Sequence, residues 1–589
     1  MFDTRLRNIA AKLTGKKLMP IYASVIVGLC SGLAALLLKF MVHGVADGLS
    51  DMVEESSYNA LYFFLTFLGI FLTSLFTRFV ICDDINHGVA KVLKARAKNH
   101  GILPAHAMYS PVVGCTLTVG FGGSAGMEAP VMHAGSAIGS NVARLFRFDT
   151  RTRTILVGAG AAAAVASIFK APIAGIVFAL EVLMLDSTIG HKLPLIVAAV
   201  TGTLVSRLAS GGGAEFSFTL SEPFKLANVP WYLGLGLCCG LFALYLQRMN
   251  KLSEKLMAGI RDWRLRAAIG GIILGSMILA LPPLFGEGFI TMKALLSGRP
   301  GSILSNTAFS GLGFGSPGFF AFLLAVLVLK PFATGVTTGS GGIGGVFAPS
   351  LFMGSLCGYL FAAGARLLGA ETVSVANFTL VGMAAFLAAL MHAPLTGVFL
   401  IAEITGGYQL LIPLMVAVLP AYAVHRSFSR YSIYTENLAA EKALVTHDKD
   451  AAALMRLELG QLVESDYKAL APDDTLAAAR ETVLASERFV EPVLGEHGSL
   501  LGLLGFDDIK PTLLDPALCA TSTVYDRMSR AEPVCLEGLG AEALLKRFKD
   551  ADAAILPVED QDGKFIGFIR KGRLLEAYRD AMLELTAED

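Results

Sequence analysis

A nine-residue motif that occurs twice constrains the fold more than any other feature of this sequence. Residues 122–130 read Gly-Gly-Ser-Ala-Gly-Met-Glu-Ala-Pro, and residues 341–349 read Gly-Gly-Ile-Gly-Gly-Val-Phe-Ala-Pro. A second pair of segments, 170–181 and 392–403, shares the pattern Ala-Pro-x-x-Gly and ends in glutamate. The two motifs lie at nearly the same distance from each other in both copies. The sequence therefore predicts an internal duplication.

The apolar composition places this duplication in a membrane. The chain has 589 residues, of which 54% are hydrophobic and 16% are charged, whereas about a quarter of a soluble domain is charged. Most charges lie in the first 18 residues and after Arg426. Several apolar segments are shorter than the ~20 residues that cross a bilayer, and glycines interrupt them. Short, broken segments in matching halves are typical of transporters with inverted repeats, whose site lies at the repeat interface.

Glu128 is the first candidate for a functional residue. The glycines before it and Pro130 after it favour a helix start, and a helix N-terminus can hold an anion. Glu128 lies where that anion would be, so its carboxylate could occupy the site itself. In a soluble protein such an acid would merely complement the helix dipole, but an acid inside a membrane is functional by default. The second copy has Phe347 at this position and offers the N–H groups of Val346 and Phe347.

The remaining composition divides the chain into segments. Arg5, Arg7 and three lysines precede the first apolar run, which places the N-terminus in the cytoplasm. Beyond Tyr434 the chain alternates short strands and amphipathic helices, again in two copies, which indicates a soluble α/β module. We predict a cytoplasmic N-terminal segment (1–18), a first membrane half (19–208), an inter-half loop (209–229), a second membrane half (230–435), a cytoplasmic linker (436–466), two α/β domains (467–515 and 516–583) and a tail (584–589).

With these features the sequence resembles the CLC family of chloride channels and chloride–proton exchangers over nearly its whole length. Asn86-His-Gly-Val-Ala90 is similar to the family's first anion-coordinating loop, and Gly126-Met-Glu-Ala-Pro130 to its gating-glutamate motif. Gly345-Val-Phe-Ala-Pro349 and Ser432-Ile-Tyr434 match two further anion-site segments. The C-terminal α/β module resembles a pair of cystathionine-β-synthase-like (CBS) domains.

This resemblance implies a polytopic helical homodimer with one chloride pathway per subunit, in the bacterial inner membrane with the CBS domains in the cytoplasm. It implies Glu128 as the gate. It also implies an anion site formed by His87, Gly88, Gly126, Met127, Val346, Phe347 and Tyr434. We expect no enzymatic activity, no metal ion, no cofactor and no nucleic-acid partner.

Two residues depart from the family pattern near this site. His87 stands where the family has a serine hydroxyl, and Met127 where it has lysine or arginine. A neutral histidine can still donate a hydrogen bond, or it can simply face solvent. The loss of a positive charge at Met127 predicts weaker attraction of anions to the outer mouth. In that case Met127→Lys would raise the chloride affinity.

The largest departure concerns protons. Exchangers of the family carry an intracellular glutamate at the position of Val182, and valine cannot bind a proton. Glu181 is the nearest acid, but its repeat partner Glu403 favours a structural role for both. We therefore favour passive, voltage- or pH-sensitive chloride conduction. The alternative is chloride/proton exchange by another proton route, and the remote alternatives are fluoride export and CBS-regulated metal transport.

A nucleotide ligand of the CBS pair has little support in the sequence. Family ribose contacts favour Ser/Thr-x-x-Asp after the last strand of each domain. Here these segments read Gly-Phe-Asp-Asp508 and Arg-Lys-Gly-Arg573, so only Asp508 matches. We expect a structural dimerisation role for the pair, with adenine nucleotide as the weaker alternative.

Overall fold

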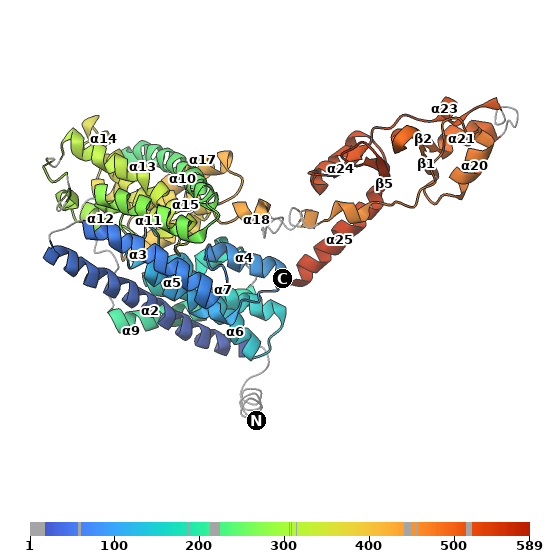
Figure 1. Ribbon diagram of the computed structural model, residues 1–589. Coiled ribbons are helices and arrows are strands. Elements are labelled where there is room, and N and C mark those ends of the chain that lie inside the picture. The colour runs from blue at the N-terminus through green and yellow to red at the C-terminus, as the bar shows by residue number, and fades with distance from the viewer. Residues whose placement is uncertain are drawn as a thin grey trace, which may run out of the picture. The chain divides into compact units, whose positions relative to one another are not determined.

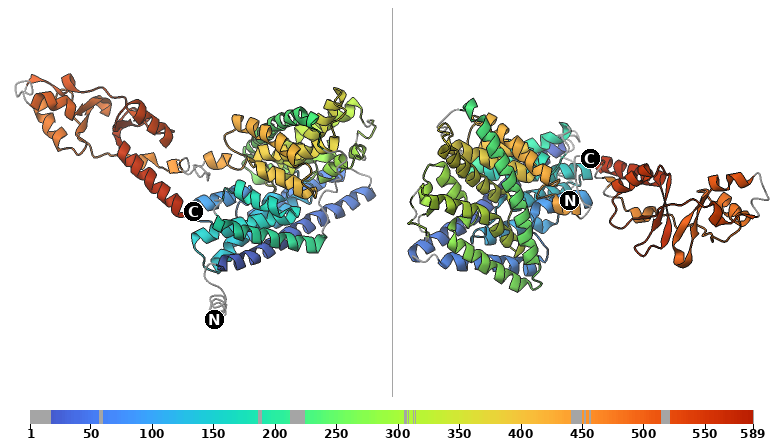
Figure 2. Two further views of the ribbon diagram at one scale, coloured as in Figure 1. Left: turned by 180° about the vertical axis from the view of Figure 1, so that it is seen from behind. Right: turned by 90° about the horizontal axis from the view of Figure 1, so that it is seen from above.

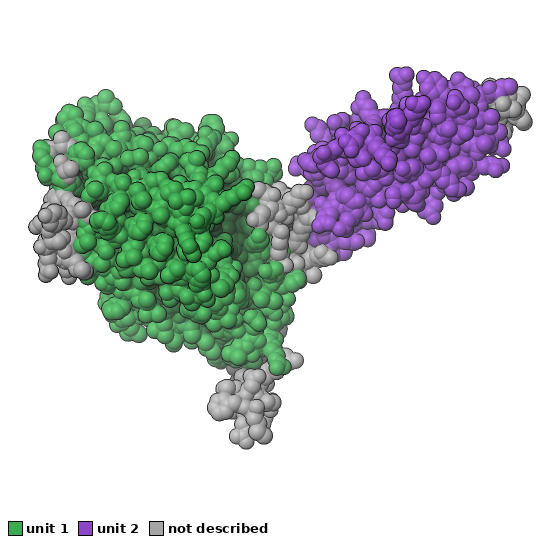
Figure 3. Space-filling view, in the orientation of Figure 1, with its two compact units in different colours: residues 1–445 green, residues 446–589 purple. Residues whose placement is uncertain are grey.

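The structure is a computed structural model of the chain. It describes residues 18–588 except 57–59, 186–188, 212–223, 305–306, 308, 312, 314, 441–449, 451–452, 455–456 and 514–520. The predicted N-terminal basic segment, most of the inter-half loop and part of the linker lie outside the described residues. Two compact units divide the chain, Met1–Val445 and Thr446–Asp589 (Figure 3).

Helices joined by loops make up the first unit, apart from one isolated β-bridge among its described residues. The helices of its first half are α2 (Met19–Ser56), α3 (Ala60–Phe76), α4 (Gly88–Lys98), α5 (Ser110–Val119), α6 (Glu128–Leu145), α7 (Thr150–Phe169), α8 (Pro172–Glu181) and α9 (Ile189–Ser210). Those of the second half are α10 (Val229–Ala258), α11 (Trp263–Ala280), α12 (Phe289–Leu296), α13 (Pro317–Gly339), α14 (Phe347–Leu367), α15 (Val375–Met391), α16 (Pro394–Ile404), α17 (Leu411–Phe428) and α18 (Glu436–Ala440). Figures 1 and 2 show the blue and cyan helices of the first half against the green and yellow ones of the second.

The lengths of these helices agree with a multi-pass membrane protein. Among the described residues, nine helices are long and apolar enough to cross a bilayer. Four further apolar helices, α5, α8, α15 and α16, have only 10–17 residues. The mixture of full-length and short apolar helices agrees in length with the expectation of helices that end within the membrane.

Within each half, glycines allow two neighbouring helices to pack in close contact. A Cβ atom at Gly139 of α6 would lie 2.0 Å from the backbone oxygen of Leu156 in α7. In the second half, a Cβ atom at Gly358 of α14 would lie 2.2 Å from the backbone oxygen of Phe378 in α15. Only glycine allows such backbone approach, which is how small residues pack helices in membranes. The α6–α7 and α14–α15 pairs therefore use the same device.

Reciprocal contacts relate the two halves. Gly126 and Gly345 exchange two backbone hydrogen bonds of 2.8 Å in an antiparallel bridge. Glu181, at the end of α8, accepts hydrogen bonds from the first N–H groups of α16, and Glu403, at the end of α16, does the same for α8. Such exchanged contacts are what two copies related by a two-fold axis make.

The second unit is a small α/β structure with two similar halves. Its first half joins β1 (Val490–Leu494) and β2 (Leu500–Gly505) in an antiparallel pair beside α20 (Leu476–Ala485). Its second half has the strand order β3-β4-β5, in which β3 (Val534–Cys535) is parallel and β5 (Phe565–Arg570) antiparallel to β4 (Ile555–Glu559). The other helices of this unit are α21 (Phe506–Ile509), α23 (Val524–Arg527), α24 (Ala541–Asp550) and α25 (Lys571–Glu588).

Each half of this unit has its own apolar core. In the first half α20 packs on the β1–β2 pair through Val483, Val493 and Leu504. In the second, Phe548 of α24 packs on the sheet, and Leu459 is buried in the same core. The sequence placed Leu459 in the linker, whereas here it belongs to the packed unit.

Candidate functional site: a carboxylate at a helix N-terminus

The two copies of the repeated motif form paired loops, residues 122–127 and 341–346, which we call the motif loops. Gly122 and Gly341 open them in the left-handed region, with φ of +97° and +101°. Each motif loop is also held by a threonine of the helix that precedes the other motif loop. Ser124 N donates to Thr337 Oγ1, and Ile343 N donates to Thr118 Oγ1. The motif loops thus hold the N-termini of α6 and α14 close together.

Glu128 lies between these two helix ends. It is the first residue of α6 and is 3% exposed. Its carboxylate lies beside the first turn of α14, because a Cβ atom on Gly126 would come close to both Glu128 Oε2 and the backbone N of Ala348. The Oε2 atom is buried and has no hydrogen-bond partner among the described residues. A Cβ atom on Gly126 would lie 2.3 Å from Oε2 of Glu128, so glycine leaves the room that the carboxylate uses. The acid of one motif copy therefore lies next to the N-terminus of the helix that follows the other copy.

The end of α14 offers donors that suit an anion. Val346, Phe347 and Ala348 open the helix, and N–H groups in a first turn have no acceptor within the helix. The ring of Phe347 stacks on Phe169 at 5.3 Å and meets Phe178 edge-on at 6.1 Å. Neutral backbone donors beside an apolar wall bind an anion without a fixed positive charge, which favours its release.

A cavity of about 50 Å³ lies beside this end of α14. Among the residues that line it are four of the predicted anion-site residues: His87, Gly88, Val346 and Tyr434. The Tyr434 hydroxyl is buried and has no hydrogen-bond partner among the described residues. A buried hydroxyl without a partner is costly, so an anion in the cavity would supply what the protein does not.

The backbone N–H groups of Gly126 and Met127, two of the predicted anion-site residues, have partners within the protein. The N–H of Gly126 donates to Gly345 O in the bridge between the motif loops. The N–H of Met127 donates to Oε1 of Glu287 at 3.0 Å. Both backbone donors are used within the protein, because the motif loops pair with each other and with a third segment. Neither residue keeps an N–H for an anion.

Glu287 is the residue that sequence reasoning missed. It is buried, 7% exposed, in the loop between α11 and α12. The signal was present, since Gly286-Glu-Gly288 also places an acid between glycines in an apolar region. This segment lies outside the repeated motifs, so the duplication does not point to it.

His87 reaches the cavity from the start of α4. His87 directly precedes α4, and its backbone is in the left-handed region, with φ of 53°. Gly88, the first residue of α4, also lines the cavity. The imidazole is 47% exposed, and its Nε2 lies 3.8 Å from Oε1 of Glu254. The ring thus faces both solvent and an acid, and a direct contact with an anion would compete with Glu254.

The predicted proton-relay position, Val182, and the neighbouring Glu181 lie at the end of α8. Val182 follows α8 and is buried. The carboxylate of Glu181 accepts three hydrogen bonds, from Leu395 N, Thr396 N and Thr396 Oγ1, at 2.8–3.0 Å. Glu181 therefore closes the N-terminus of α16 and is held in that place.

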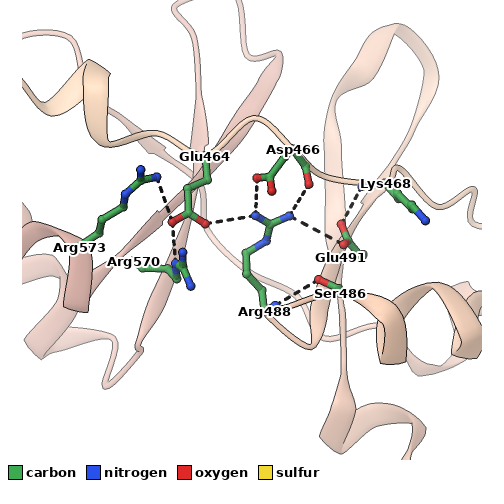
Figure 4. Close-up of polar contacts among 8 residues, drawn as sticks. All are labelled: Glu464, Asp466, Lys468, Ser486, Arg488, Glu491, Arg570 and Arg573. Carbon is green, nitrogen blue, oxygen red and sulfur yellow. Dashed lines mark hydrogen bonds and ion pairs between the residues drawn. The ribbon is translucent and has the colours of Figure 1, made fainter.

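A charged cluster occupies a cleft of about 740 Å³ in the second unit. Figure 4 shows the carboxylate of Glu464 between Arg488 and the pair Arg570 and Arg573. Arg488 also bonds Asp466 at 2.7 Å, and this hydrogen bond holds the pKa of the exposed Asp466 carboxyl below its usual value. The arginines of the cleft are thus already paired with acids of the chain.

Asp508 does not line this cleft. Its Oδ2 accepts the N–H of Gly505 and its Oδ1 the hydroxyl of Ser529. The residue that matched the ribose-binding pattern therefore closes the start of α21. Among the described residues, no group of three or more His, Cys, Asp or Glu side chains is placed to hold a metal ion.

Comparison with known proteins gives a consistent result. The model of the family described as voltage gated chloride channel matches residues 68–426. A ClcB-like protein of Ralstonia nicotianae is 32% identical over 362 residues, which cover 60% of this chain and 80% of that protein. The H(+)/Cl(-) exchange transporter ClcA of Vibrio cholerae is 28% identical over 436 residues, covering 71% of this chain and 88% of that protein.

Two solved structures have a similar fold. The structure of a slow cyanobacterial Cl−/H+ antiporter matches with a TM-score of 0.62 and 24% identity, covering 72% of this chain and 97% of that one. A eukaryotic CLC transporter matches with a TM-score of 0.61 and 17% identity, covering 94% of this chain and 98% of that one. At these identities the similarity shows a shared fold.

Proposed function

Since this chain belongs to the voltage-gated chloride channel family, we propose that it conducts chloride passively through a pathway gated by Glu128. The observation that carries the proposal is the buried Glu128 carboxylate beside the N-terminus of α14, where its Oε2 has no hydrogen-bond partner among the described residues. A carboxylate and a chloride ion compete for the same donors, so the pathway is closed while Glu128 remains in this place. Protonation of Glu128, or its displacement by an incoming anion, opens it.

The residues around the gate divide this work. The N–H groups of Val346 and Phe347 and the hydroxyl of Tyr434 hold the anion on the cavity side. His87 and Gly88 line the inner approach to this position. Since none of these groups except His87 can carry a positive charge, the anion is bound by dipoles and can leave quickly.

Passive conduction is favoured because the relay position holds Val182, whose side chain cannot bind a proton. Glu181 is adjacent, but three hydrogen bonds fix it at the start of α16. Exchange of chloride for protons is the second candidate, and it is supported by the name of the Vibrio cholerae relative, a H(+)/Cl(-) exchange transporter. Fluoride export is a lesser alternative, against which Tyr434 argues.

For the second unit we propose a CBS pair that stabilises a homodimer at the cytoplasmic face of a bacterial inner membrane. Its two similar α/β halves, each with its own core, support this assignment. Because Glu464 already pairs with Arg488, Arg570 and Arg573, an added phosphate would have to displace a resident carboxylate. Adenine nucleotide therefore remains the weaker alternative, and a structural role is favoured.

The test is chloride efflux from liposomes as a function of external pH. In Glu128→Gln the side chain keeps its shape and loses its charge, so we expect the efflux to continue and to lose its pH dependence. Glu371→Gln, which neutralises an exposed acid between α14 and α15, serves as the matched control and should behave like the unaltered protein. A pH dependence that survives in Glu128→Gln would contradict the assignment of the gate.

A further inference from the structure

Glu287 lies at the N-terminus of α6, where its carboxylate binds a backbone N–H group that an anion could otherwise use. Its Oε1 accepts the N–H of Met127, the residue directly before the gate, at 3.0 Å. N–H groups at a helix start are the donors that hold anions in such sites. At the N-terminus of α6 this donor is therefore occupied by a carboxylate of the protein.

The loop that carries Glu287 is clamped in place. Gly286 N donates to Gly122 O at 3.2 Å, and a Cβ atom on Gly122 would lie 2.2 Å from the ring of Phe285. On its other side, a Cβ atom on Gly288 would lie 2.3 Å from the ring of Phe352. Both residues next to Glu287 are thus packed against fixed neighbours, one of which is a motif loop. This packing restrains the backbone on both sides of the Glu287 carboxylate.

A buried lysine accompanies this carboxylate. Lys330 of α13 is fully buried, and its Nζ donates to Leu284 O at 3.3 Å and Gly286 O at 2.9 Å. Its ammonium lies 4.9 Å from the centre of the Phe352 ring and interacts electrostatically with Glu287. Buried charges are retained when they are paired. Lys330 therefore both fixes the loop and balances the charge of Glu287.

We propose that Glu287 is a fixed internal anion that competes with chloride at the N-terminus of α6. The two helix ends at the site then differ in kind, since α14 is closed by the mobile carboxylate of Glu128 and α6 by the immobile carboxylate of Glu287. This arrangement lowers the affinity of the outer pathway for chloride and positions the Met127–Glu128 peptide. The inference deepens the proposed function and rests on it.

The experiment measures chloride binding by calorimetry and chloride efflux from liposomes for the full-length protein. In Glu287→Gln the competing charge is lost while the side chain keeps its shape. We expect the chloride affinity to rise by roughly tenfold, the effect of one hydrogen bond to a charged group. In Glu287→Gln/Lys330→Met the lysine charge is also removed, and the affinity should fall back toward that of the unaltered protein.

The controls separate this inference from its alternatives. A purely structural role for Glu287 would lower the melting temperature of Glu287→Gln without raising the chloride affinity. An affinity that is unchanged or lower in a variant of normal melting temperature would overturn the proposal. Glu371→Gln should bind chloride like the unaltered protein. Absence of chloride efflux from the unaltered protein would instead refute the proposed function, which keeps the two failures distinct.

Discussion

Two carboxylates of this chain stand at helix N-termini of the same site, and their surroundings differ. Glu128 begins α6, and its carboxylate lies beside the first turn of α14 with the small Gly126 next to it. Glu287 reaches the N–H of Met127 from a loop that Lys330 holds by two of its carbonyl groups. The proposed gating role of Glu128 and the proposed fixed position of Glu287 both depend on these neighbours rather than on the acid itself.

At the residue scale, Glu181 and Glu403 should behave as structural acids. Glu181→Gln keeps an oxygen acceptor but loses the charge that favours a helix N-terminus, so we expect a loss of about 1–2 kcal/mol of stability. The matched variant Glu403→Gln should lose a similar amount, since Glu403 closes α8 in the same way. Thermal melting in detergent measures the loss, and chloride efflux per folded protein should not change. Altered efflux in Glu181→Gln alone would support a proton-relay role.

The pH dependence of the second unit is also set by single residues. Arg488 holds the pKa of Asp466 below its usual value of about 3.9. A depressed pKa in the folded state adds stability above the unfolded pKa, and this stability is lost as the pH falls through the folded value. Limited proteolysis of the full-length protein between about pH 3 and pH 6 should show opening of this unit at the acidic end. In Asp466→Asn the contribution should be absent at every pH, so equal pH profiles would contradict it.

At the scale of elements, the contact between α6 and α7 depends on glycine. In Gly139→Ala the new methyl group would meet the backbone oxygen of Leu156, which cannot rotate away, so we expect a loss of about 1–3 kcal/mol. Gly364→Ala in α14 is the matched control, because nothing lies within 4 Å of its Cβ position and alanine favours helix by about 0.5–1 kcal/mol. Melting temperatures of the purified variants should move in opposite directions. Equal shifts would argue against this packing.

Elements that repeat were predictable from the sequence, and single ones were not. The shared motif placed the starts of α6 and α14, and the strands of the second unit followed from their alternation. The loop before the short helix α12 lies outside the repeated motifs, and its sequence signal is one acid between two glycines, Gly286-Glu-Gly288. Met127 shows the same limit, because its N–H partner is Glu287, which lies 160 residues away in the chain.

At the scale of the whole molecule, the two units differ in what the sequence could specify. The helical fold of the membrane unit can be predicted from the lengths of its apolar segments and from the internal repeat. These two features together imply a site between its halves. The second unit follows from strand and helix alternation, but the charge pairs in its cleft join residues far apart in sequence, such as Glu464 and Arg570. Long-range pairs of this kind leave no periodic signal. The ligand of such a cleft therefore cannot be predicted from sequence alone.

The central claim is that this molecule conducts chloride past Glu128 without obligatory proton exchange. The most direct measurement is chloride efflux from liposomes that hold the full-length protein, with external pH recorded and no proton ionophore at the start. We predict chloride efflux that requires valinomycin to balance charge and that moves no protons. Proton uptake driven against its gradient by chloride, and lost in Glu128→Gln, would contradict the account and show an exchanger that bypasses Val182.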